Sequence, residues 1–142
     1  IFTRDRFEDL SNFIFEKYYN YAREYRLHIS ANGCFHTCRK LRKDSTESQD
    51  RWKFNNDTCI WVLPTNDSFN KPETWEEIVE DCQIALEEVG LDFGAFDVRV
   101  STGGSWKIIE VNSAPALGDL GKDKYLEELK LIIKHKIENN EY

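Results

Sequence analysis

The sequence predicts an α+β domain in which helices cover one face of a mainly antiparallel sheet. Three observations support this prediction. Apolar residues recur at helical spacing in three segments, shorter stretches alternate apolar and polar residues, and hairpin-type turns join consecutive strands. With 142 residues, 40% of them apolar, the chain is expected to form a single domain, residues 1–142, around one core.

The first predicted element is an amphipathic helix over residues 6–21, whose apolar residues recur every three or four positions. From Glu24 the period changes to two, which predicts a half-buried strand. The pair Asn32 and Gly33 tolerates positive φ in a tight hairpin turn. A second strand is therefore predicted to return over residues 34–43.

The rest of the chain contains three more predicted strands and two more helices. The middle helix has the clearest boundaries, because Thr74 and Glu77 form a capping box and Gly90 follows the apolar stripe. We expect both helices to pack on the sheet face that carries Tyr25 and Leu27. The other elements are strands over 58–63, 93–100 and 106–112, and a helix over 125–137.

The formal net charge of −7 is distributed unevenly. Residues 1–56 hold 11 Lys and Arg against 8 Asp and Glu, whereas residues 57–142 hold 8 against 18. This distribution argues against nucleic-acid binding, which needs a broad positive face. A small basic cluster suits a compact anion such as a phosphate, or it is simply solvated. Its members are Arg39, Lys40, Arg42 and Lys43.

Cysteine usage and hydropathy bear on the compartment. The four Cys include no CxxC pair, and no apolar run is long enough to span a membrane. We therefore expect reduced thiols, a cytoplasmic location and no membrane partner. Cys34, His36 and Cys38 alternate on one strand, but its ends would lie about 13 Å apart, too far for one zinc ion. Because the chain begins at Ile1 and contains no Met, we expect it to be a piece of a longer chain.

Oxygen-bearing side chains gather on the last predicted hairpin. Glu110 and Asn112 share one strand face, roughly 6–7 Å apart, and Asp97 lies on the preceding strand. Carboxylate and amide oxygens suit Mg²⁺ or Mn²⁺ better than Zn²⁺. Spacing alone leaves a second interpretation open, in which Asp97 is a surface acid paired with Arg99 or Lys107.

The residues of this region resemble a known superfamily. Residues 91–98 (LDFGAFDV) and 109–117 (IEVNSAPAL) are similar to the end of an ATP-grasp domain. Residues 23–29 (REYRLHI), together with Asn32-Gly33 and Arg39-Lys40, resemble a hairpin motif of the same group. The resemblance spans residues 18–117 and is nearest to glutathione-synthetase-like, ribosomal-protein-modifying and bacteriophage members.

The resemblance implies an ATP- and Mg²⁺-dependent ligase that joins a carboxylate to an amine or thiol through an acyl phosphate. Phosphoryl transfer depends mainly on positioning and charge neutralisation, which agrees with cations opposite a metal site. The metal ligands that it implies, for Mg²⁺ or Mn²⁺ bridging the ATP phosphates, are Asp97, Glu110 and Asn112. The cations that it implies at ATP are Arg26 and Lys40, which face the transferred phosphoryl group, and Arg42.

The resemblance covers one lobe of a two-lobed family. ATP-grasp enzymes hold the nucleotide between two lobes, and this chain resembles the C-terminal catalytic lobe without the upstream, nucleotide-clamping one. We therefore expect an upstream lobe or partner chain, an open site face, and little ligase turnover by residues 1–142 alone. Where the family ends N-[ST]-x-P-G, this chain has Pro115 and Ala116, which changes the turn but not the ligands. The alternative is a noncatalytic ATP-grasp-like module that docks to a partner.

Overall fold

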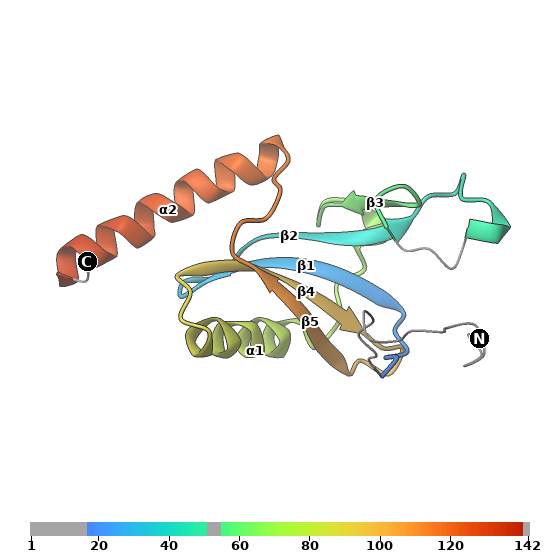
Figure 1. Cartoon of the computed structure of the whole chain (residues 1–142), viewed down its shortest axis with the longest axis horizontal. Coiled ribbons are helices and arrows are strands. Elements are labelled where there is room, and N and C mark those ends of the chain that lie inside the picture. Colours follow the sequence, from blue (N-terminus) through green and yellow to red (C-terminus); the bar gives the residue numbers. More distant parts are fainter. Residues whose placement is uncertain (1–16, 51–54, 141–142) are drawn as a thin grey trace, which may run out of the picture.

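A five-stranded antiparallel sheet forms the centre of the computed structural model, which describes residues 17–50 and 55–140 (Figure 1). The strand order is β3-β2-β1-β4-β5. This arrangement confirms the predicted α+β class and antiparallel sheet. The elements are β1 (Arg23–Ser30), β2 (Gly33–Arg42), β3 (Cys59–Val62), α1 (Trp75–Glu88), β4 (Phe93–Val100), β5 (Trp106–Asn112) and α2 (Asp119–Asn139), with short 3-10 helices at Ser48–Asp50 and Asp67–Phe69.

The hydrophobic core lies between the sheet and α1. The alternate residues of β1 that were predicted to be buried have no exposed surface, and those of β4 complete the same layer. Burial of these side chains is the main favourable contribution to folding. The core residues from these three elements are Tyr25, Leu27, Ile29, Trp75, Ile78, Cys82, Leu86, Phe96, Val98 and Val100.

The predicted boundaries of α1 are confirmed, but the predicted capping box at Thr74 is wrong. Thr74 stands at the N-cap position, but its hydroxyl donates to the carbonyl of Gly104 at 3.2 Å instead of capping the helix. The helix ends before Gly90, which has a φ of +69°. Thr74 therefore links the start of α1 to the turn between β4 and β5.

The helix α2 lies on the opposite side of the sheet from α1 (Figure 1). The Tyr125 hydroxyl is 2.8 Å from Nδ1 of His28, and the Ser30 hydroxyl donates to Glu128 at 2.6 Å. His28 and Ser30 alternate with the core residues of β1, so they face away from α1. The prediction that both helices cover the core face is wrong for α2. Its polar Tyr125 and Glu128, rather than its apolar stripe, decide which face it contacts.

Two further predictions need correction near the N-terminus. The helix predicted over residues 6–21 lies mostly outside the described residues, and the described part, 17–21, is not helical. In the β1–β2 hairpin the loop residues are Ala31 and Asn32, one position earlier than predicted. Positive φ occurs at Gly33, at +111°, and not at Asn32. In the part of the chain that the structure describes, neither helix has the length and apolar character needed to cross a bilayer.

Gly94 of β4 allows a close approach to β5. A Cβ at this position would lie 2.8 Å from Cγ2 of Val111, and the side chain of Val has little rotamer freedom with which to move. We expect Gly94→Ala to lower the free energy of unfolding by about 1–3 kcal/mol in urea titrations. Gly118→Ala is the matched control, because nothing lies within 4 Å of its added Cβ. Equal effects of the two substitutions would contradict this explanation.

Candidate functional site

A bulge in β5 turns Glu110 toward the face opposite the core. Asp97 pairs with Glu110, whereas the next residue, Val98, pairs with Ile108, so Ile109 has no partner. Without this extra residue, Glu110 would share the core-facing side of Ile108. Bulges commonly redirect side chains in this way next to functional sites. The position of Asp97 and Glu110 on the same sheet face therefore depends on one unpaired residue.

A second bulge, in β2, separates Cys34 from the residues that follow it. His28 pairs with His36 and Ile29 pairs with Cys34, which leaves Phe35 unpaired. Cys34 consequently packs against the core, whereas His36 pairs with a residue of the other face. The alternation of Cys34, His36 and Cys38 on one face, expected from parity, is therefore wrong at Cys34.

The carboxylates Asp97 and Glu110 lie directly opposite each other on adjacent strands. Nδ2 of Asn112 donates to Oε1 of Glu110 at 2.9 Å, so these three predicted residues form one cluster. Arg26 donates to both oxygens of Asp97, from Nε at 2.6 Å and from Nη2 at 2.8 Å. These hydrogen bonds are the main reason that the pKa of Arg26 is raised. The alternative partners of Asp97 considered from the sequence, Arg99 and Lys107, do not make this ion pair.

Glu24 pairs with two cations, Lys40 and Arg99, beside this cluster. It was not predicted from the sequence as a site residue. Its side chain is 5% exposed, and it accepts from Lys40 at 3.2 Å and from Arg99 at 2.8 Å. Glu24 therefore holds Lys40 on the same face as Arg26. The available sequence signal was that Glu24 and Arg26 share parity in β1.

Trp61 of β3 lies beside both cations. The guanidinium carbon of Arg26 is 4.9 Å from the centre of a Trp61 ring, and Nζ of Lys40 is 5.4 Å from it. Cation–π attraction at these distances helps to fix the two side chains. Trp61, which is 36% exposed, therefore contributes to the position of both cations as well as to packing.

One pocket of about 650 Å³ is lined by Arg26, Lys40, Trp61, Asp97 and Glu110, and we call it the ion-pair pocket. Four of the six predicted site residues belong to it. Asn112 adjoins it through Glu110, and Arg42, opposite Cys59 at the end of β2, is not among its lining residues. The lining residues are Arg26, Lys40, Asn55, Asn56, Cys59, Trp61, Asp97, Glu110, Ala116, Leu117 and Gly118.

The basic cluster divides between separate environments. Arg39 donates to the carbonyl of Ser68 at 2.8 Å and lies over the ring of Tyr25 at 5.8 Å, on the core side. Lys43 donates to the carbonyl of Asp57 at 2.8 Å. Of the four cluster residues, Lys40 alone lines the ion-pair pocket, so the cluster is not one anion-binding surface.

The donor atoms of the pocket fit Mg²⁺ that also has ligands outside the protein. Within residues 17–50 and 55–140 there is no group of three or more His, Cys, Asp or Glu placed to hold a metal ion. Asp97 and Glu110 supply two carboxylates, and Asn112 can add an amide oxygen. Mg²⁺ is commonly bound by one or two carboxylates together with substrate phosphates and water. The residues therefore fit a magnesium–phosphate complex better than a metal held by protein alone.

Similarity to known proteins is found in the structure and not in the sequence. The sequence matches no protein-family model and no curated protein. The structure is similar to that of the ATP-grasp ligase PsnB complexed with a minimal precursor, with a TM-score of 0.49 and 13% identity over 73% of this chain and 29% of that one. It is also similar to the macrocyclase MdnC from Microcystis aeruginosa MRC bound with the precursor peptide MdnA, with a TM-score of 0.42 and 17% identity over 70% of this chain and 27% of that one. The chain thus spans less than a third of the length of either protein, and at these identities the likeness concerns the fold alone.

Proposed function

We propose that this chain is the catalytic lobe of an ATP-grasp-type ligase that joins a carboxylate to an amine or thiol through an acyl phosphate. One observation carries the proposal. Arg26, Lys40, Asp97 and Glu110, which come from four different strands, line a single pocket on one sheet face. The motifs that contain these residues are the ones that resemble the ATP-grasp superfamily.

The chain's own residues would act by neutralising and orienting charge. In this reaction a substrate carboxylate oxygen attacks the terminal phosphorus of ATP and ADP leaves; the amine then attacks the acyl carbon, phosphate leaves and the nitrogen loses a proton. Arg26 and Lys40 would stabilise the charge on the transferred phosphoryl group. Asp97, Glu110 and Asn112 would hold Mg²⁺, which when bound supplies charge neutralisation at the phosphate oxygens.

A second lobe or a partner chain would complete the nucleotide site. The ion-pair pocket has walls from the sheet, from residues 55–56 and from the segment 116–118. Glu110 is exposed on it. A phosphate bound here would keep much of its water, which screens its charge interactions. We therefore propose that the isolated chain has little ligase turnover and that activity requires the second lobe.

Removing one carboxylate charge tests the proposed site. We expect Mg²⁺·ATP to raise the melting temperature of the chain together with its second lobe or partner, which we call the full protein. Glu110→Gln should weaken this nucleotide binding by about tenfold or more. The melting temperature without ligand should change little, because Glu110 is exposed. Glu76→Gln, which changes an exposed glutamate on α1, is the control.

The same titration distinguishes the alternative, a noncatalytic module that docks to a partner. A full protein that is not stabilised by Mg²⁺·ATP would favour the module. Stabilisation by ATP that is equal with and without Mg²⁺, or unchanged in Glu110→Gln, would contradict the proposed metal site. A lower melting temperature of Glu110→Gln without ligand would instead assign Glu110 a structural role.

A further inference from the structure

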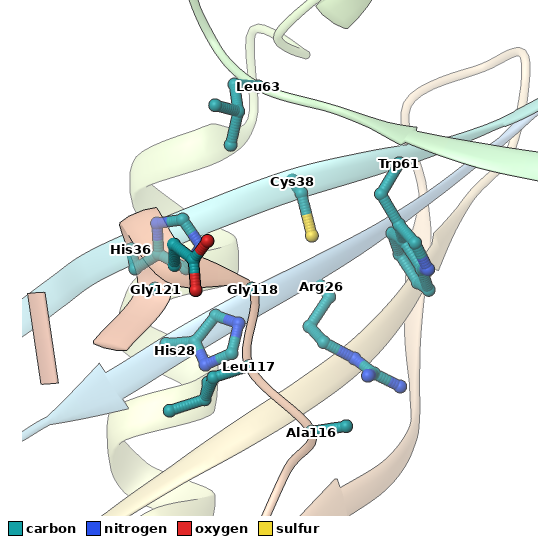
Figure 2. A pocket seen from close by; sticks show the side chains of 11 residues that line it. Arg26, His28, His36, Cys38, Trp61, Leu63, Ala116, Leu117, Gly118 and Gly121 are labelled. Carbon is teal, nitrogen blue, oxygen red and sulfur yellow. The ribbon is translucent and has the colours of Figure 1, made fainter. Parts of the chain in front are cut away.

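A second pocket, of about 380 Å³, lies beside the ion-pair pocket on the same sheet face. We call it the histidine groove. Figure 2 shows Arg26 and His28 from β1 and His36 and Cys38 from β2 around the segment that leads into α2. The groove is lined by the side chains of His28, His36, Cys38, Trp61, Leu63, Leu117 and Asp119, among others.

The groove and the ion-pair pocket meet at one end. Arg26 and Trp61 line both, and so does the segment 116–118. A molecule lying in the groove would therefore have one end beside the guanidinium of Arg26. Its other end would lie among Leu63, Leu117 and His36.

Away from Arg26, the groove is lined by one carboxylate, that of Asp119, which is 99% exposed and pairs with Lys122 at 3.0 Å. The buried polar groups of the groove are uncharged at neutral pH. Burial lowers the pKa of His28 to about 3, and burial is also the main cause of the lowered pKa of His36. Burial raises the pKa of the Cys38 thiol to about 12. Trp61, Leu63 and Leu117 add apolar surface. A negatively charged group would lose hydration in this environment without gaining a partner, and it would also be repelled by Asp119, which is costly.

We propose that the histidine groove binds the uncharged, apolar tail of the carboxylate substrate and directs its carboxylate toward Arg26. This inference rests on the proposed function, because it places the carboxylate next to the residues assigned to phosphoryl transfer. A volume of 380 Å³ is at the lower end for small-molecule pockets, so the tail should be a single ring or a short branched chain. Substrates with a second negative charge on the tail should be excluded.

Binding of simple carboxylates to the labelled protein tests the proposal. The probes are phenylpropanoate, phenylpropanol, which lacks the carboxylate, and glutarate, whose tail is charged. We expect phenylpropanoate to shift the ring signals of His28 and His36 and the methyl signals of Leu117 in NMR spectra. The alcohol and glutarate should bind at least about tenfold more weakly.

A pair of variants locates the binding. Leu117→Glu places a negative charge in the groove and should weaken phenylpropanoate binding by about tenfold or more. Leu126→Glu changes an exposed leucine of α2 that does not line the groove, and it should bind like the unmodified protein. Equal binding of all three probes, no shifts at His36 and Leu117, or equal effects of the two variants would overturn the proposal.

The outcome is separable from that of the proposed function. If Mg²⁺·ATP stabilises the protein but phenylpropanoate does not bind in the groove, the ligase assignment stands and the substrate inference fails. If phenylpropanoate binds in the groove with the predicted selectivity but Mg²⁺·ATP has no effect, the groove is a carboxylate site and the ligase assignment fails.

Discussion

Replacing Glu24 with Ala is expected to lower the free energy of unfolding by about 3 kcal/mol. The Glu24 carboxylate is almost fully buried and pairs with Lys40 and Arg99, whose side chains are 13% and 30% exposed. Its removal leaves two cations close together without their shared counterion, and Lys40 has little access to water. Urea unfolding at neutral pH measures the difference.

The exposed ion pair between Lys71 and Glu76 provides the control for Glu24. These side chains are 53% and 80% exposed and lie 3.0 Å apart. Glu76→Ala should cost less than about 1 kcal/mol, because solvent screens exposed pairs. Losses of similar size at Glu24 and Glu76 would show that burial of the Glu24 network does not matter for stability. Glu24→Gln should resemble Glu24→Ala, since the missing charge dominates.

Buried His28 is expected to make the fold sensitive to acid. Its pKa is lowered to about 3 in the folded protein, first by burial and then by repulsion from His36 and Arg26, while Asp97 opposes the shift. The unfolded chain binds a proton near the ordinary pKa of about 6.5. Below that pH the unfolded state therefore gains protons that the folded state does not, and stability falls as pH decreases toward 3.

The size of this effect follows from the width of the pH window. Between about pH 6.5 and about pH 4.5, His28 should account for a loss of roughly 2–3 kcal/mol. We expect His28→Gln to lower stability at neutral pH, because the hydrogen bond with Tyr125 is altered, yet to reduce the further loss on acidification. Urea unfolding at the two pH values measures this. His135→Gln, on the exposed surface of α2, should keep the full acid sensitivity.

Periodicity predicted the strands and α1 well because burial enforces it. Leu27 and Ile29 alternate with polar residues in β1, and residues 93–100 and 106–112 were predicted with the bounds that β4 and β5 have. The hairpins could be predicted from the glycines near their turns, because few other residues adopt positive φ. These signals depend on neighbours in the chain, so a single sequence contains them.

The predictions that were wrong concern features that depend on residues distant in the sequence. The side of the sheet on which α2 lies is decided by Tyr125 and Glu128 meeting residues about a hundred positions earlier, and helix periodicity carries no such information. The bulges at Phe35 and Ile109 add a residue to one strand only, which a period-two pattern cannot anticipate. Asp97, Glu110 and Asn112 were predicted as metal ligands from motif residues, and the ion pair of Asp97 with Arg26 was not predicted.

The two hydrogen bonds from Arg26 to Asp97 have a thermodynamic consequence for any ligand that competes for the carboxylate oxygens of Asp97. The folded chain already neutralises the Asp97 carboxylate internally, so the pocket is not a site of uncompensated negative charge. A divalent cation at Asp97 would exchange with the guanidinium or share the carboxylate with it. Breaking the ion pair between Arg26 and Asp97 costs free energy. The observed affinity for the cation is therefore lower than its intrinsic affinity, as at any site whose binding-competent state is a minor population. An anion that draws Arg26 away lifts that penalty, so cation and anion would each increase the affinity for the other.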